Sequence, residues 1–195
     1  MIVAIVLSAG ESSRMGSPKA LLPIGEKSFL GRIVSALQAT KAGKIVVVLG
    51  HNAEEIRKKI SGLPVTVVVN QNYARGQLSS LVAAIRSLER ESVDGVLVHL
   101  VDHPFLDASL VDRMIDGFYE SKKLIVVPRY RGRRGHPVIF SGALFPELVR
   151  TPLDQGAKAV VRAHRDDILE IDTEEEGVAI DIDTPEEYRR YSGRD

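Results

Sequence analysis

The chain alternates short apolar runs with segments of helical period, and this alternation restricts the fold more than any other feature of the sequence. Five runs rich in β-branched residues suit buried strands: residues 2–7, 45–49, 65–69, 96–101 and 124–127. Nearly continuous apolar strands are typical of parallel sheets that helices cover on both faces. The sequence therefore predicts an α/β fold, a Rossmann-like and mainly parallel sheet with helices on both faces.

One predicted helix illustrates the pattern between the strands. Asp107 is a suitable N-cap for it. Its apolar residues fall on one stripe at helical spacing, namely Leu110, Val111, Met114, Ile115 and Phe118. In a sheet of this kind ligands bind beyond the carboxyl ends of the strands. The residues that directly follow each predicted strand are therefore the first candidates for a functional site.

The pattern is looser after residue 128. We expect short strands at 137–140, 168–171 and 178–182, and a helix over 154–164. No linker rich in proline and serine divides the chain. Residues 1–195 are therefore expected to form a single domain.

A last helix is predicted to begin at Thr184. Thr184 can cap it, Pro185 suits its first position, and Glu187 can reach back to the capping amide. These three residues form the pattern of a capping box with proline at the first helical position.

The charge balance and the lack of cysteine exclude several classes of protein. Lysine plus arginine and aspartate plus glutamate both total 26, so the formal net charge is zero. A broad basic field for nucleic acid or an acidic membrane is therefore not expected. With no cysteine, the chain cannot form disulfides or thiolate zinc sites. The opening apolar run is too short to span a bilayer and lacks a basic leader, so we expect a cytoplasmic protein.

The loop after the first predicted strand has the sequence S-A-G-E-S-S-R-M-G-S-P-K over residues 8–19. Its glycines allow a tight turn close to a ligand, and its successive amides can form an anion nest. Arg14 and Lys19 add two positive charges suited to a polyphosphate. The spacing matches neither the P-loop nor the dinucleotide motif G-x-G-x-x-G. A purely structural turn is the alternative for the glycines and serines alone.

Carboxylates follow two later segments of the predicted sheet. Asp102 ends the run 96–101, and Asp181 and Asp183 lie close to the last helix. Mg²⁺ binds one or two carboxylates and completes its coordination with water and phosphate oxygens. Alternate residues of a strand share a face, so Asp181 and Asp183 could both point at one cation. The alternatives are an ordinary turn before Pro104 and a simple helix cap.

Two further loops carry polar groups suited to ligands. The segment N-Q-N-Y-A-R-G-Q-L-S-S-L, residues 70–81, is predicted to open a helix, and its amides and hydroxyls could read the edge of a base. Gln77 and Ser80 are our candidates there. A basic loop, R-G-R-R-G-H-P over residues 131–137, places His136 beside three arginines. A structural role for His136 is about as plausible from this pattern.

These motifs, in this order, resemble the MobA-like nucleotidyltransferases and most closely the molybdenum cofactor cytidylyltransferases. The first loop resembles the pattern L-A-A-G-x-S-x-R-M-G-x-x-K and departs from it only at Ser8. Ala9 stands where the guanylyltransferase branch has glycine, which favours CTP. The runs G-Q-x-x-S-L and G-H-P also match the cytidylyltransferase branch. Lys158 replaces the arginine of a family turn, D-x-G-A-R.

The resemblance implies a fold of the nucleotide-diphospho-sugar transferase type and a transfer of CMP from CTP to a phosphorylated acceptor, with release of pyrophosphate. The implied acceptor is molybdopterin cofactor, with a transient contact to a molybdoenzyme. Lys19, Arg14 and Asp102 are the implied catalytic residues, and Asp102 with Asp181 or Asp183 is implied to bind Mg²⁺. The implied substrate-binding residues are Leu7, Ser8, Ala9, Gly10, Ser12, Ser13, Gly16, Gln77, Ser80 and His136.

Three alternatives remain open at this point. The same chemistry could act on another acceptor, such as a sugar phosphate or phosphocholine. A non-catalytic carrier or chaperone for the cofactor is the second alternative, which intact Lys19 and Asp102 disfavour. A dinucleotide-dependent oxidoreductase is the third, and the first loop lacks the glycine spacing that it requires.

Overall fold

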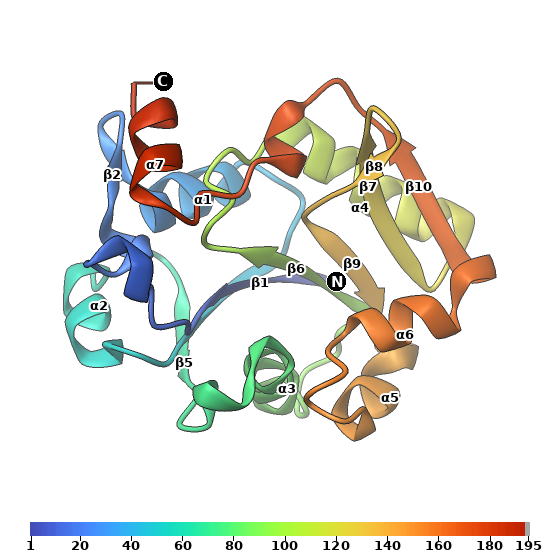
Figure 1. Cartoon of the computed structure of the whole chain (residues 1–195). Helices are drawn as coiled ribbons and strands as arrows, with labels where there is room; N and C mark the ends of the chain where they lie inside the picture. Colours follow the sequence, from blue (N-terminus) through green and yellow to red (C-terminus); the bar gives the residue numbers. More distant parts are fainter. Residues whose placement is uncertain (194–195) are drawn as a thin grey trace.

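A computed structural model describes residues 1–193, and it is built around one large sheet (Figure 1). Residues 194 and 195 of the expected domain lie outside the described residues. The strands of the sheet are β1 (Ile2–Ser8), β4 (Lys44–Leu49), β5 (Thr66–Val69), β6 (Gly95–Leu100), β7 (Ile125–Tyr130), β8 (Arg133–Arg134), β9 (Val138–Ser141) and β10 (Ile168–Asp172). A separate hairpin pairs β2 (Pro23–Ile24) with β3 (Lys27–Ser28).

The strand order explains which loops meet at the edge of the sheet. It runs β10-β7-β9-β6-β1-β4-β5, with β8 paired to β7. The central strand β1 pairs in parallel with β4 on one side and with β6 on the other. Only β8 and β9 run antiparallel to their neighbours. The prediction of a mainly parallel sheet is therefore confirmed, and the carboxyl ends of β1, β4 and β6 lie side by side.

Helices cover both faces of the sheet. They are α1 (Phe29–Gln38), α2 (Ala53–Lys59), α3 (Gln77–Ser87), α4 (Ala108–Ser121), α5 (Phe145–Arg150), α6 (Lys158–Ala163) and α7 (Pro185–Tyr191). Alternate residues of β1 point to opposite faces. One set packs against α1, α2 and α4, and the other packs against α3, α5 and α6 (Figure 1). All seven residues of β1 are buried, as its apolar run predicts.

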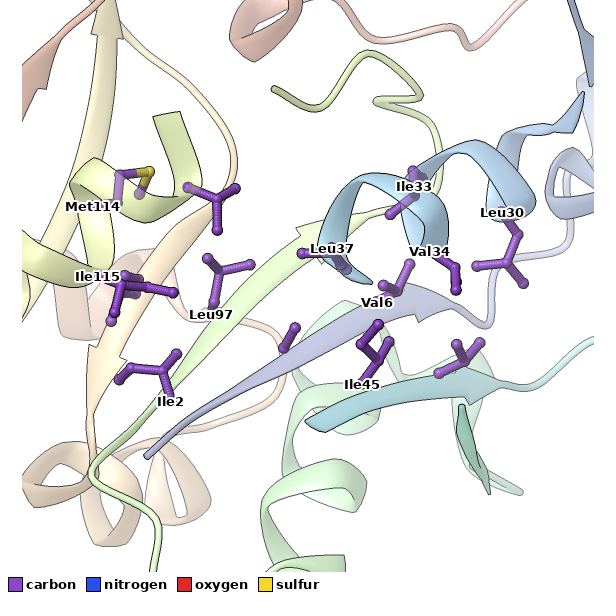
Figure 2. Close-up of a cluster of buried hydrophobic side chains, with 14 of the residues drawn as sticks. Ile2, Val6, Leu30, Ile33, Val34, Leu37, Ile45, Leu97, Met114 and Ile115 are labelled. Atoms are coloured by element: carbon purple, nitrogen blue, oxygen red, sulfur yellow. The ribbon is translucent and has the colours of Figure 1, made fainter. Parts of the chain in front are cut away.

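Figure 2 shows one of the clusters of buried hydrophobic side chains. Val34 and Leu37 of α1 lie over Val6, and Met114 of α4 packs beyond Leu97. Burying side chains of this size typically contributes about 1.5–3 kcal/mol each. The predicted cap of α4 is present, because Asp107 Oδ1 accepts a hydrogen bond of 2.7 Å from the Leu110 amide.

Several predicted boundaries need correction. Val101 lies outside β6, and the strand predicted over 124–127 continues to residue 130. The strand β5 pairs only with β4 and is half-exposed rather than buried, because it lies at the edge of the sheet. The helix predicted over 154–164 covers only Lys158–Ala163, since a turn with Gly156 at φ 65° precedes it.

The strand predicted over residues 178–182 is wrong. Glu176–Ala179 is a short 3₁₀ helix, and the chain then runs extended without a ladder of its own. Two single contacts hold it instead, because the His136 amide donates to Val178 O at 3.0 Å and the Ile182 amide donates to Asp102 O at 2.9 Å. A Cβ on Gly135 would come within 2.1 Å of Val178 O, so glycine is required for this approach.

The last helix begins as predicted. Thr184 and Glu187 form a complete capping box around the start of α7. The helix α7 lies beside β2 (Figure 1), and the Tyr188 hydroxyl donates to Pro23 O at 2.6 Å. Within residues 1–193, the helices are all too short or too polar to cross a bilayer.

Candidate active site

The loops at the carboxyl ends of β1 and β6 and the start of α3 enclose a cleft of about 310 Å³, which we call the first cleft. Most of the residues expected at the site line it. These are Leu7, Ser8, Ala9, Gly10, Ser12, Ser13, Arg14, Lys19, Gln77, Ser80, Asp102 and Asp183. The structure therefore brings together the two ends of the chain and its middle, as parallel strands with a common carboxyl edge require.

The first loop is held in shape by its own hydrogen bonds. Ser12 has φ 51° and Gly16 has φ 67°, so two residues of the loop are left-handed. The Met15 amide donates to Ser12 O at 2.9 Å, and the Lys19 amide donates to Ser12 Oγ at 3.1 Å. Gly16 therefore shapes the turn and does not line the first cleft. A Cβ on Gly10 would meet nothing within 4 Å, so no protein contact demands glycine there.

Lys19 lies at the centre of a charged group in this cleft. Its ammonium forms an ion pair with Asp183 Oδ1 and lies 3.8 Å from Asp102 Oδ2. Arg14 Nη2 binds the other oxygen of Asp183 at 2.8 Å. The Lys19 side chain is only 11% exposed, whereas that of Arg14 is 64% exposed. The lysine is thus fixed inside the cleft, and the arginine lies at its mouth.

The backbone places Asp183 beside Asp102. Ile182 is fully buried, and its amide donates to Asp102 O, which joins the C-terminal segment to the end of β6. Glu187 Oε2 accepts hydrogen bonds from the amides of Asp183 and Thr184 at 2.8 and 2.9 Å. The cap of α7 therefore also fixes the backbone from which Asp183 reaches Lys19.

The pKa values of these two carboxyls are shifted in opposite directions. Burial raises the pKa of Asp102, and the nearby charge of Asp183 adds to this effect. The hydrogen bond from Lys19 lowers the pKa of Asp183. Asp102 Oδ1 is buried and has no hydrogen-bond partner within residues 1–193. A buried carboxylate oxygen without a donor suits a bound cation.

The carboxylates can supply only part of a cation's coordination. No group of three acidic or histidine side chains in the described chain is arranged to bind a metal ion. Mg²⁺ usually takes one or two carboxylates and completes its octahedron with water and phosphate oxygens. Asp102 and Asp183 fit that requirement at a site where a phosphate would bind.

Asp181 and Asp183 have different environments. Asp183 lines the first cleft and contacts both Lys19 and Arg14, whereas Asp181 is exposed and does not line it. The two side chains do not both line the first cleft, and the strand on which that expectation depended is missing. The geometry therefore favours Asp183 as the second ligand, and its role stays a prediction.

A second cleft, of about 790 Å³, opens beside the first and shares Leu7, Gly76, Gln77 and Leu100 with it. Apolar side chains form its floor, including Val98, Val138 and Phe140. Its polar lining includes Arg75, Arg134, His136 and Lys158. His136 therefore lies in the second cleft rather than the first. A ligand with a flat apolar body and an anionic group would fit this lining.

Behind Asp102 lies a cluster of histidines that the sequence pattern did not indicate. His99 and His103 are buried, and the ring centroid of His103 lies 6.2 Å from that of His99 and 5.1 Å from that of His136. His99 Nε2 lies 2.8 Å from His103 O, so it supports the turn that carries Asp102. Burial lowers the pKa of His99 to about 3 and that of His136 to about 4. These two rings are therefore neutral at physiological pH.

Tyr73 is another lining residue that the sequence pattern missed. Tyr73 lines the first cleft, and its hydroxyl lies 3.3 Å from His51 Nδ1. A Cβ on Gly50 would come within 2.6 Å of Tyr73 and 2.7 Å of Ala9 O. Gly50 thus allows the tyrosine to pack closely against the first loop, a contact between segments that are distant in sequence.

A mainly parallel sheet with a serine- and glycine-rich first loop, and a lysine held in a cleft between two carboxylates, are typical of the class of the nucleotidyltransferases. The chain belongs to the family of the MobA-like NTP transferase domains, which matches residues 4–168.

Relatives along the whole chain carry different names. "Nicotine blue oxidoreductase" from Paenarthrobacter nicotinovorans is 28% identical over 197 residues, which cover 97% of this chain and 95% of the relative. "Molybdenum cofactor cytidylyltransferase" from Escherichia coli is 27% identical over 194 residues, which cover 96% of this chain and 93% of the relative. Rv0371c from Mycobacterium tuberculosis, which has also been solved with manganese, has a TM-score of 0.83 at 30% identity, with 97% and 96% of the chains covered.

Proposed function

We propose that the protein transfers CMP from CTP to a phosphorylated acceptor, of which molybdopterin cofactor is the first choice, and releases pyrophosphate in a Mg²⁺-dependent reaction. One observation carries the proposal: the Lys19 side chain, only 11% exposed, lies in the first cleft between Asp102 and Asp183. A lysine ammonium group fixed between two carboxylates suits the transfer of a phosphorus-centred group, because positioning and charge stabilisation supply most of the catalysis in such reactions.

In this proposal the acceptor phosphate attacks the α-phosphorus of CTP, and the bond to the bridging oxygen of the β-phosphate breaks. Lys19 offsets the charge that grows around the α-phosphorus, and Arg14 at the mouth holds the β- and γ-phosphates. Asp102 and Asp183 would hold a Mg²⁺ ion, which would neutralise negative charge on the phosphate oxygens. An ionised phosphate is already a nucleophile, so the cleft needs no separate general base.

The second cleft is the proposed acceptor site. Its apolar floor can pack against a ring system, and Arg134 and Lys158 can meet a phosphate. Gln77 lines both clefts, so donor and acceptor would meet there. The name of the Escherichia coli relative supports a molybdopterin-type acceptor for this chain.

A second candidate function follows from another relative's name. The chain is as similar to "Nicotine blue oxidoreductase" as to the cytidylyltransferase, and over the same length. An oxidoreductase would need a hydride or electron donor, and the first loop lacks the dinucleotide glycine spacing. The group of Lys19, Asp102 and Asp183 in the first cleft therefore favours nucleotidyl transfer. A sugar phosphate or phosphocholine as acceptor, and a pure carrier role for the cofactor, remain alternatives for the same clefts.

The test measures pyrophosphate release with each of CTP, GTP, ATP and UTP and Mg²⁺, against a panel of acceptors that includes molybdopterin, sugar phosphates and phosphocholine. We expect turnover with CTP and molybdopterin. A parallel assay follows the oxidation of NADH and NADPH with a quinonoid dye as acceptor. Turnover in that assay, without pyrophosphate release in the first, would contradict the proposal and favour the oxidoreductase.

A further inference from the structure

A chain of hydrogen bonds leads from the end of β5 to the first cleft. Asn70 directly follows β5, and its side chain is buried. Its backbone amide donates to Leu49 O at 2.8 Å. Asn70 Oδ1 accepts a hydrogen bond of 2.9 Å from the Asn72 amide. Its Nδ2 donates to Ser79 Oγ at 2.8 Å and to Ser80 Oγ at 3.0 Å. Three polar side chains are thus joined in one network.

The direction of this network is fixed by the backbone. A backbone amide can only donate, so the atom of Asn70 that faces the Asn72 amide must be the oxygen. The opposite orientation of the Asn70 amide would place two donors against each other. The NH₂ group of Asn70 must therefore face the two serines, and both serine oxygens accept from it.

The two serines then differ in where their own protons can go. Ser79 Oγ donates to Gly76 O at 2.7 Å, and it also lies 3.1 Å from Asn72 O, so its proton is used within the protein. For the Ser80 hydroxyl, no hydrogen bond to an acceptor occurs within residues 1–193. Ser80 is 3% exposed and lines the first cleft. Its proton is therefore available to a ligand in that cleft.

We propose that Asn70 is a positioning residue that makes Ser80 a fixed hydrogen-bond donor toward the nucleotide base, and that this donor selects a base with an acceptor at its ring nitrogen. Among pyrimidines this base is cytosine, whose N3 accepts, whereas N3 of uracil carries a proton and donates. The inference rests on the proposed function, because it places the base in the first cleft, and it supplies a physical reason for a preference for CTP over UTP.

The expected discrimination follows from the polarity of the pair. With cytosine the Ser80 proton gains an acceptor, whereas with uracil the Ser80 oxygen can accept from N3–H only by turning its own proton away from the ligand, where no acceptor is available within residues 1–193. Leaving one buried donor unsatisfied weakens binding by about tenfold or more. Ser79 cannot substitute for Ser80, because its proton already has partners at Gly76 and Asn72.

The test is titration calorimetry with CTP and with UTP, both with Mg²⁺, on the full chain. In Asn70→Asp, a carboxylate accepts from the Asn72 amide and from Ser80, so the Ser80 oxygen is left to accept from the ligand. The ratio of CTP to UTP affinity should fall by about tenfold or more, toward a preference for UTP. Gln71→Asp is the matched control: it adds the same charge at the next residue, which is exposed and outside the first cleft, and should keep the wild-type ratio.

Ser80→Ala keeps the inference testable if Asn70→Asp does not fold. Loss of the hydroxyl should weaken CTP binding and bring the CTP to UTP ratio close to one. A wild-type preference for CTP that persists in both variants would overturn the role of Asn70 and Ser80 and leave the proposed function intact. No binding of any nucleoside triphosphate to the wild type would overturn the proposed function, and this inference with it.

Discussion

The two clefts differ in how their polar groups are held. In the first cleft the charges are paired with one another, since Lys19 and Arg14 both bind Asp183, and the loop is fixed by bonds to Ser12. The second cleft has an apolar floor, and its cations lie on the rim. Arg134 there is tied to Glu170 at 2.6 Å, whereas Lys158 takes part in no ion pair within residues 1–193.

Under the proposed function, this difference would divide the work, with the reaction in the first cleft and recognition of the acceptor in the second. A preorganised group of charges suits a reaction in which charge moves, because the groups need no rearrangement as the reaction proceeds. An apolar surface with charges at its edge can accept ligands of several shapes. The relatives named as a cytidylyltransferase and as an oxidoreductase are consistent with a family in which one scaffold serves different substrates.

The largest effect should come from Lys19, at the centre of the first cleft. Lys19→Ala removes a charge that acts mainly as charge redistributes in the transition state, so kcat should fall roughly 10²- to 10³-fold with a smaller change in KM for CTP. Lys19→Arg should restore only part of the rate, because a broad guanidinium differs from a compact ammonium. Steady-state kinetics measures both.

Arg14→Ala is the comparison variant for this prediction. It lies at the mouth of the cleft and should chiefly raise KM for CTP, since the outer phosphates are held in the ground and transition states alike. If Lys19→Ala kept kcat within about twofold of wild type, Lys19 would not contact the reacting phosphorus, and the chemistry would not belong to the first cleft.

The proposed metal ligands, Asp102 and Asp183, offer a second test of the first cleft. Asp102→Asn and Asp183→Asn should each raise the Mg²⁺ concentration needed for half-maximal rate by about tenfold or more, as expected when a cation loses one charged ligand. Asp181→Asn is the matched control and should leave the metal requirement unchanged, because Asp181 is exposed and outside the cleft. A shift in Asp181→Asn with none in Asp183→Asn would reverse the assignment.

Substitutions in the second cleft should change the KM for the acceptor rather than the KM for CTP. Lys158→Glu should raise KM for the phosphorylated acceptor about tenfold while KM for CTP stays constant, because the change reverses a charge on the rim of that cleft alone. Arg162→Glu makes the same reversal one turn further along α6, outside the cleft, and serves as the control. Equal effects of Lys158→Glu on both KM values would show that the clefts do not divide the two substrates.

The smallest expected effect concerns stability in acid. Lys19 and Arg14 hold the pKa of Asp183 below 3.8, so its ionised form favours the folded state. This contribution to the free energy of unfolding is fully present above the ordinary pKa of 3.8, and it disappears as the pH falls through the lower pKa that Asp183 has in the folded protein. Urea midpoints of wild type and Asp183→Asn should therefore differ at about pH 6 and converge toward about pH 2. A difference that grew on acidification would contradict this ion pair.

The fold and the first loop could be predicted from the sequence because their signals are local. The run that forms β1 is apolar over its whole length, and the loop that follows it carries Arg14 and Lys19 within twelve residues. The capping box at Thr184 is likewise a matter of four neighbouring residues. Periodicity and turn chemistry act over such distances, so each of these features can be recognised without tertiary structure.

The rest of the site depends on contacts that no local pattern contains. The choice between Asp181 and Asp183 follows from the ion pairs of Asp183 with Arg14 and Lys19, which lie far away in the sequence. The rings of His103 and His136 come within 5.1 Å of each other because β9 pairs with β6 and brings two distant segments together. A strand was expected over 178–182, whereas the segment begins in a 3₁₀ helix and single tertiary contacts determine its path.

One contact has a consequence for how the protein is made. Asp183 reaches Lys19 across 164 residues of sequence, and the Ile182 amide joins the end of β6. Synthesis proceeds from the N-terminus, so Lys19 and Asp102 emerge from the ribosome well before Asp183. During that interval the chain has the first loop and the sheet but lacks one of the two carboxylates. The arrangement of charges in the first cleft can therefore form only after residue 183 has been translated.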